Sequence, residues 1–149
     1  MADNEYLTWD ESFKIGIALI DKQHKELVGY INQLYRACLA GNDAVAPAFK
    51  EAMSHMVDYV RLHFNTEQEL LKRINYPSFN DHKKQHDELI KDILITAKNY
   101  RDGKKFVPHN FVRTLRDWVL SHIAVHDKAY STYIHEQIGK GKITKQHLN

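Results

Sequence analysis

The chain has 149 residues, 43% of them apolar and 27% charged, which is the size and balance of one folded globular domain and not of a disordered or fibrous chain. Its net charge is +2 without a dense cluster of lysine and arginine, and no uncharged stretch is long enough to cross a bilayer, so we expect neither nucleic acid nor a membrane as a partner. The single cysteine, Cys38, excludes an intramolecular disulfide and, with an acidic start unlike a signal peptide, favours a cytoplasmic protein.

The first part of the chain lacks the spacing of a helix. Apolar side chains occur there at Trp9, Phe13, Ile15 and Ile17. The alternation from Phe13 to Ile17 would suit a strand, but no second stretch of the chain offers a partner strand. We therefore expect residues 1–19 to form an extended arm packed on the rest of the domain.

Four segments place apolar residues three and four positions apart, which is the spacing of one face of an α-helix. The helices are expected at about residues 21–40, 45–75, 79–101 and 108–138. Asp21 is a suitable N-cap for the first helix, and Gly41 is a suitable residue to end it. Pro77 should stop the second helix, Gly103 should close the third, and Pro108 should begin the fourth.

These helices are long and their connections are short, so consecutive helices are expected to lie antiparallel. The predicted fold class is all-α: an up-down-up-down antiparallel four-helix bundle with an extended N-terminal arm, forming one domain over residues 1–149. The polar segment 139–149 is expected to fray beyond the last helix.

Histidine is unusually frequent, with ten copies, and several of them interrupt the apolar faces of the helices. Each predicted helix turns at least one imidazole toward the core, and two helices also bring a carboxylate. These inward-facing polar residues are His24, His63, Glu67, His82, His86, His122 and Asp127. The remaining histidines, expected outside this set, are His55, His109, His126, His135 and His147.

Buried carboxylates without a counter-charge are costly, and a bound cation removes that cost. Residues four apart share a helix face, so His63 with Glu67, and His82 with His86, can each chelate one ion. Five imidazoles and two carboxylates exceed the four ligands of a zinc site and fit two metal ions that share bridging carboxylates. Imidazole with carboxylate, and no thiolate, suits iron. The alternative is a set of separately hydrogen-bonded core histidines, which is weak for seven positions in register on four helices.

The order of these residues resembles the hemerythrin family, specifically the bacterial hemerythrins. The motifs that carry the resemblance are His24, then His63-Phe64-x-x-Glu67, then His82-x-x-x-His86, and then His122-Ile123-x-x-x-Asp127. The flanking sequence is also similar: Trp9 in the arm, Ile20-Asp21-x-Gln23-His24 at the start of the first helix, and Trp118 four residues before His122. The resemblance extends over residues 7–138, and all seven ligand positions of the family are filled.

The resemblance implies a non-haem di-iron centre with two iron ions per chain. One iron would be bound by His82, His86 and His122, and the other only by His24 and His63. Both ions would be bridged by Glu67, by Asp127 and by an oxo or hydroxo group from solvent. The second iron would keep one open position, where dioxygen would bind.

The family pattern also implies a pocket for the oxygen molecule. Val119, one turn before His122, is expected to lie over the open position, with Phe64 and Trp118 as walls of the same pocket. The side chain of Val119 could equally be an ordinary core residue, whereas Phe64 and Trp118 are expected to be pocket walls first.

The donor set favours binding of dioxygen over its activation. Carboxylate-rich di-iron proteins of the ferritin-like class use a doubled Glu-x-x-His motif, which this chain lacks. Five neutral imidazoles with only two anions stabilise high-valent iron less well. We therefore expect reversible dioxygen binding, for storage, delivery or sensing, and not an enzyme. The alternatives are a di-iron redox enzyme acting on oxygen, peroxide or nitric oxide, and a sensor or iron-handling module that needs a partner.

The fourth helix presents a conflict between ideal geometry and the family pattern. On an ideal α-helix, His122 and His126 lie about 40° apart, whereas His122 and Asp127 lie about 140° apart. Ideal geometry would select His126 as the ligand, but two bridges need two carboxylates, and the family pattern selects Asp127. We therefore predict a π-type turn between His122 and Asp127, with His126 turned away from the metal ions.

Overall fold

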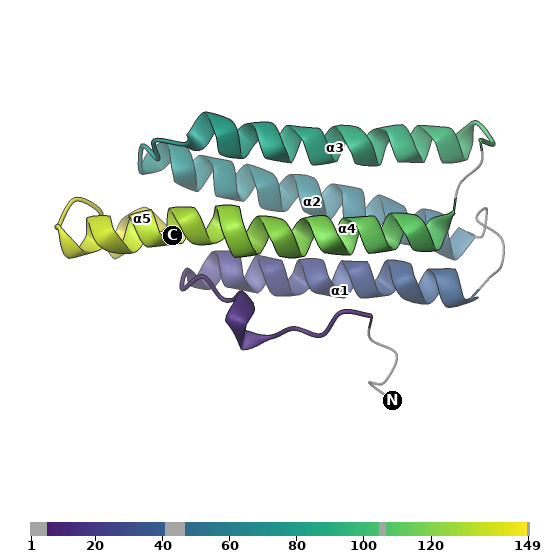
Figure 1. Cartoon of the computed structure of the whole chain (residues 1–149), viewed down its shortest axis with the longest axis horizontal. Helices are drawn as coiled ribbons and strands as arrows, with labels where there is room; N and C mark the ends of the chain where they lie inside the picture. The colour runs from purple at the N-terminus through teal and green to yellow at the C-terminus, as the bar shows by residue number, and fades with distance from the viewer. Residues whose placement is uncertain (1–5, 41–46, 105–106, 149) are drawn as a thin grey trace.

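The structure is a computed structural model and describes residues 6–40, 47–104 and 107–148. Four helices lie side by side along the long axis of the molecule (Figure 1): α1 (Ala18–Ala40), α2 (Pro47–Arg73), α3 (Phe79–Arg101) and α4 (Pro108–His122). A π-helical turn, η3 (Ile123–Asp127), continues α4 into α5 (Lys128–Gly139) as one rod. No strand occurs among the described residues. The predicted all-α antiparallel four-helix bundle is confirmed.

The core of the bundle consists of the apolar faces of all four helices. Its most deeply buried side chains include Ile31, Leu34, Met56, Leu71, Ile93, Leu115 and Ile134, each at most 1% exposed. Burial of one such side chain stabilises the fold by roughly 1.5–3 kcal/mol. Among the described residues, no helix combines the length and the apolar character needed to cross a membrane.

Three helix ends share one backbone arrangement. Asn75, Gly103 and Gly141 have φ values of 54°, 73° and 73° and directly follow the last turns of α2, α3 and α5. In each case the amide of this residue donates to the carbonyl three positions earlier, and the next amide donates five positions back. This Schellman motif satisfies carbonyls that the end of a helix leaves without partners. Gly103 therefore closes α3 as predicted, whereas Gly41 and the expected helix start at Val45 lie outside the described residues.

The start of α1 differs from the prediction. The helix begins at Ala18, so the interpretation of Asp21 as its N-cap is wrong. The Asp21 carboxylate instead accepts hydrogen bonds from the amides of Ile15 (2.8 Å) and Gly16 (3.1 Å), which lie before the helix. Gly16 has a φ of 87°, a conformation that glycine adopts without steric cost. Asp21 therefore fixes the turn from the arm into α1.

The arm lies alongside the bundle and contains a short 3₁₀ turn, η2 (Glu11–Phe13) (Figure 1). The amide group of Asn32, on α1, accepts from the Leu7 N–H and donates to the Leu7 carbonyl, both at 2.8 Å. Farther along the arm, the hydroxyl of Ser131, on α5, donates to the carbonyl of Ile15. The side chains of Leu7 and Ile15 are buried, so the arm adds to the core as well as to the hydrogen bonds.

The described residues after α5, up to Leu148, fold back on the bundle in the structure, whereas the sequence predicted a polar tail that frays. This segment forms a 3₁₀ turn, η4 (Lys145–Leu148), against α2. Ile143 is buried, and the Arg73 guanidinium donates to the carbonyl of His147 at 2.9 Å. Ile143, the partly buried Leu148 and the hydrogen bond from Arg73 together connect this segment to the bundle.

Candidate metal centre

The inward-facing polar residues meet at one place in the core. They come from α1, α2, α3, α4 and η3, and each side chain is at most 5% exposed: His24, His63, Glu67, His82, His86, His122 and Asp127. The structure therefore brings together all seven residues that the sequence analysis selected.

Glu67 divides the histidines into two groups. Its Oε1 atom lies 2.5 Å from Nε2 of His82 and 3.3 Å from Nε2 of His86. Its Oε2 atom lies 3.1 Å from Nε2 of His63 and 3.6 Å from Nε2 of His24. The two oxygens of one carboxylate therefore face two different sets of imidazoles.

Asp127 repeats this division. Its Oδ1 atom lies 3.1 Å from Nε2 of His122 and 3.3 Å from Nε2 of His82, whereas its Oδ2 atom lies 3.0 Å from Nε2 of His24. Both carboxylates thus stand between a group of three histidines and a group of two, which is the placement required of groups that bridge two ions.

The donor atoms of this cluster fit a bound cation better than they fit one another. Both oxygens of Asp127, Oε2 of Glu67 and Nε2 of His24 are buried without a hydrogen bond of acceptable geometry to any described residue. Such orphaned atoms are costly in a protein interior unless a metal ion binds them. Within the described residues, the ligand atoms of Glu67 and three histidines, and those of Glu67 and two histidines, form two compact groups that could each hold an ion.

The electrostatics show what the two buried anions do when no cation is present. Burial opposes the charged form of His24 and His82, but Asp127 and Glu67 outweigh it and raise the pKa of both imidazoles to about 9. The same contacts overcome the burial of the two carboxylates and lower the pKa of each. Burial lowers the pKa of His86 to about 4. Protons on His24 and His82 therefore supply the positive charge that a cation would otherwise provide.

The predicted π-type turn between His122 and Asp127 is confirmed. The amide of Lys128 donates to the carbonyl of Ile123, five residues earlier, across the turn η3. The wider turn brings Asp127 onto the face of His122. The imidazole of His126 instead lies 3.1 Å, by its Nδ1 atom, from the side-chain amide of Gln85, outside the cluster.

Three glutamines that the sequence analysis did not select hydrogen-bond to the outer nitrogens of clustered imidazoles. Oε1 of Gln23 lies 2.8 Å from Nδ1 of His63, and Oε1 of Gln85 lies 3.1 Å from Nδ1 of His122. Nε2 of Gln68 lies 3.0 Å from Nδ1 of His86. The available signal was their position, because each glutamine is the neighbour in sequence of a clustered residue.

The residues assigned to an oxygen pocket lie beside the cluster. Phe64 stacks on His86, with ring centroids 3.7 Å apart and planes at 1°, and Trp118 stacks on His122 at 4.5 Å and 12°. Val119 is buried at 1% exposure. Both stacked aromatics thus contact the three-histidine group. The pocket itself stays a prediction.

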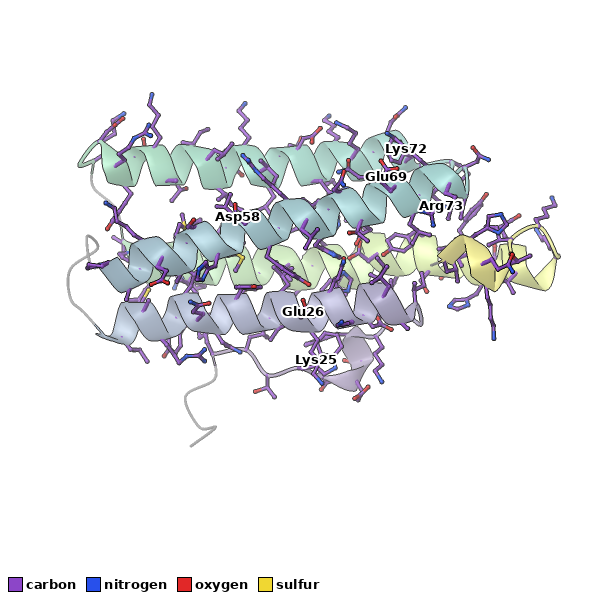
Figure 2. All side chains as sticks on the ribbon, turned by 180° about the vertical axis from the view of Figure 1, so that it is seen from behind. Lys25, Glu26, Asp58, Glu69, Lys72 and Arg73 are labelled. Carbon is purple, nitrogen blue, oxygen red and sulfur yellow. The ribbon has the colours of Figure 1, made fainter. Side chains whose placement is uncertain are left out.

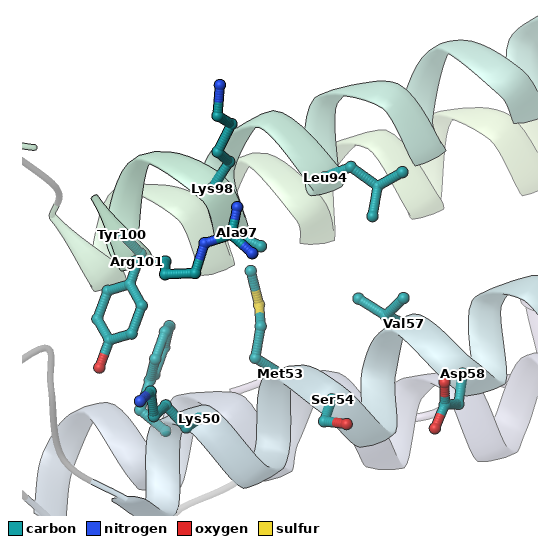
Figure 3. A pocket seen from close by; sticks show the side chains of 11 residues that line it. Lys50, Met53, Ser54, Val57, Asp58, Leu94, Ala97, Lys98, Tyr100 and Arg101 are labelled. Carbon is teal, nitrogen blue, oxygen red and sulfur yellow. The ribbon is translucent and has the colours of Figure 1, made fainter. Parts of the chain in front are cut away.

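Other features of the molecule lie apart from this centre. Glu69 is exposed on the outer side of α2 (Figure 2), although it is only two residues from Glu67. A hollow of about 580 Å³ lies between α2 and α3, where Met53 and Val57 face Leu94 (Figure 3). None of the clustered residues lines this hollow.

Comparison with known proteins agrees with the geometry. Residues 15–134 match the family model described as the hemerythrin HHE cation binding domain. The chain is 29% identical over 125 residues to a bacteriohemerythrin of Methylococcus capsulatus, covering 83% of this chain and 93% of that protein. It is 31% identical over 122 residues to a hemerythrin-like protein of Naegleria gruberi, covering 82% of this chain and 88% of that protein. A crystal structure of wild-type hemerythrin superposes with a TM-score of 0.78 at 26% identity, covering 85% of this chain and 96% of that chain. The chain belongs to the hemerythrin family.

Proposed function

We propose that this protein binds two non-haem iron ions per chain at the buried cluster and binds dioxygen reversibly there. The observation that carries the proposal is the division of the carboxylate oxygens. Glu67 and Asp127 each turn one oxygen to the three-histidine group and the other to the two-histidine group. Binding of iron and, typically, of oxygen by the hemerythrin family supports the same function.

The chain would hold the two ions unequally. His82, His86 and His122 would hold one ion, His24 and His63 would hold the other, and both carboxylates would bridge them. The group with fewer imidazoles keeps more coordination space. The iron pair, when bound, supplies the electrons that reversible oxygen binding requires.

The protein side chains would control access and charge. All the ligand side chains are nearly inaccessible to solvent, so bulk water is kept away from the centre. Two buried anions balance part of the charge of two divalent ions, and neutral imidazoles balance none of it. A carrier with this donor set needs no acid or base for substrate chemistry, so we assign no enzymatic reaction. We also propose a cytoplasmic location, the reducing compartment that suits a chain with one cysteine.

The test combines iron analysis with optical spectroscopy. Protein loaded anaerobically with Fe(II) should contain two irons per chain, and its spectrum should change when oxygen is admitted and return when oxygen is removed. Asp127→Asn should lose this behaviour, and the exposed control Glu69→Gln should keep it. One iron per chain, no response to oxygen, or steady formation of an oxidised product would overturn the proposal.

A further inference from the structure

We propose that Gln23, Gln68 and Gln85 are positioning residues of the metal centre. Each would hold one ligand histidine with its proton on Nδ1, and together, as neutral acceptors, they would keep the reduction potential of the bound iron high. The first part concerns the metal site alone, whereas the second part rests on the proposed function.

The three amides form a series of links around the bundle. Gln23 of α1 contacts His63 of α2, and its distance of 2.8 Å is the shortest of the three. Gln68 of α2 contacts a histidine of α3 at 3.0 Å, and Gln85 of α3 contacts a histidine of α4 at 3.1 Å. Each glutamine is adjacent in sequence to a ligand of its own helix but orients a ligand of the next helix. The series therefore couples the positions of neighbouring helices to the geometry of the centre.

The orientation of the Gln23 amide is set without a metal ion. The Thr66 hydroxyl donates to the carbonyl of Leu62 at 3.0 Å, so its oxygen is left to accept. The Gln23 amide nitrogen donates to that oxygen at 3.3 Å. The amide oxygen of Gln23 must then face Nδ1 of His63, which makes Nδ1 the donor and leaves Nε2 free for a metal ion.

The Gln85 amide is held from both sides by imidazoles. Its oxygen lies 3.1 Å from Nδ1 of His122, and its nitrogen lies 3.1 Å from Nδ1 of His126. This orientation of the Gln85 amide requires a proton on Nδ1 of His122 and none on Nδ1 of His126, and rotating the amide by half a turn would require the reverse. His126 therefore serves the centre indirectly, by fixing the amide that fixes His122.

Gln68 lies beside His86 at the surface of the bundle. Both residues line a surface hollow of about 330 Å³, so water would compete for Nδ1 of His86 if the amide were absent. In the structure the amide nitrogen of Gln68 lies 3.0 Å from Nδ1 of His86. Rotating this amide by half a turn would place its oxygen at the same position. Binding of a metal ion by Nε2 of His86 requires the orientation with the Gln68 oxygen toward Nδ1, because Nδ1 then carries the proton and needs an acceptor.

The neutrality of all three partners has an electronic consequence. A carboxylate in the same place would draw the Nδ1 proton toward itself and make the imidazole a stronger donor to the metal. Stronger donation favours Fe(III) over Fe(II). A protein that releases oxygen must return its iron to Fe(II), so amides suit this centre better than carboxylates do.

The experiment compares Gln→Leu and Gln→Glu variants at positions 23, 68 and 85 of the full chain. The control is Gln33→Glu, because Gln33 lies on α1 like Gln23, but within the described part of the chain its side chain hydrogen-bonds to His55, at 3.4 Å, outside the centre. Zn(II) affinity is measured by competition, Nδ1–H resonances by NMR of the Zn(II)-loaded protein, and the midpoint potential on the iron-loaded protein. Circular dichroism establishes that each variant is folded.

We expect each Gln→Leu variant to bind Zn(II) about 10- to 100-fold more weakly and to lose one slowly exchanging Nδ1–H resonance. Each Gln→Glu variant should retain that resonance, at a shifted frequency, and should lower the midpoint potential, whereas Gln33→Glu should change neither. Retention of all resonances in the leucine variants would overturn the positioning role. Potentials equal to that of the control would overturn the electronic role. Zn(II) binding with these resonances, in a wild-type protein that does not respond to oxygen, would support positioning and refute only the proposed function.

Discussion

Loading the metal-free centre with a divalent cation should expel protons from two of its histidines. The pKa of His24 and that of His82 are raised to about 9, so both imidazoles hold a proton at pH 7. The pKa of His86 is lowered to about 4, so this imidazole holds none. A metal ion binds only the unprotonated Nε2 atom. We therefore expect about two more protons to be released per chain at pH 7 than at pH 10.

The direction of this pH dependence follows from the raised pKa values. Above pH 9, His24 and His82 lose their protons even without a metal ion, so metal binding has none to displace. In the unfolded chain both residues return to the ordinary pKa of 6.5. The stability that they give to the metal-free protein is therefore complete below pH 6.5 and is lost as the pH rises through 9.

Calorimetric titration with Zn(II), in pairs of buffers that differ in ionisation enthalpy, measures the protons released. Zn(II) is supplied as a soluble chelate whose own proton exchange is measured separately at each pH, because aqueous Zn(II) binds hydroxide near pH 10. Glu69→Gln, which alters an exposed carboxylate of α2, should reproduce the wild-type difference. Equal proton release at pH 7 and pH 10 would show that His24 and His82 do not carry the compensating charge.

Asp127→Asn should lower the bound metal below two ions per chain and remove the metal-dependent rise in melting temperature. Where metal exceeds its dissociation constant by 100-fold, the stabilisation lost is about 2.7 kcal/mol. Glu69→Gln should keep both the metal content and the rise in melting temperature. His126→Ala should keep the wild-type metal content, measured by elemental analysis, and a large loss would contradict its place outside the ligand set. Gly16→Ala should lower the free energy of unfolding in urea by about 1–2 kcal/mol, because φ is 87° and a Cβ would lie 2.9 Å from Nε2 of His135. Gly29→Ala, in the open middle of α1, should raise it by about 0.5–1 kcal/mol, and equal effects at the two glycines would refute the strain at Gly16.

The sequence alone was sufficient for the class of fold and for the residues that converge in the core. Apolar spacing and breaker residues are local properties of the sequence, so they were sufficient to predict four helices and, for α3, the observed bounds. Polar residues on apolar faces are costly, and this cost singled out the seven clustered residues. The resemblance to the hemerythrin family, together with the need for two bridging carboxylates, selected Asp127 as a ligand, and from this followed the prediction of the π-type turn, because Asp127 reaches the face of His122 only if the helix widens.

Only the tertiary structure decided features that depend on a distant part of the chain. Asp21 has the sequence of an N-cap, yet it binds the arm at Ile15 because the folded arm brings those amides within reach. The polar tail contacts the bundle through the buried side chain of Ile143 and the hydrogen bond from Arg73 to His147, and no periodic pattern reveals these contacts.

The contacts of the glutamines likewise depend on the packed bundle. Gln23 and His63 are 40 positions apart, and the position of a glutamine next to a clustered residue does not show which imidazole of another helix it will meet. The division of the carboxylate oxygens between two groups of histidines is also set by the relative rotation of packed helices. Periodicity shows which face of a helix is buried, but it does not show which atoms of other helices that face will meet.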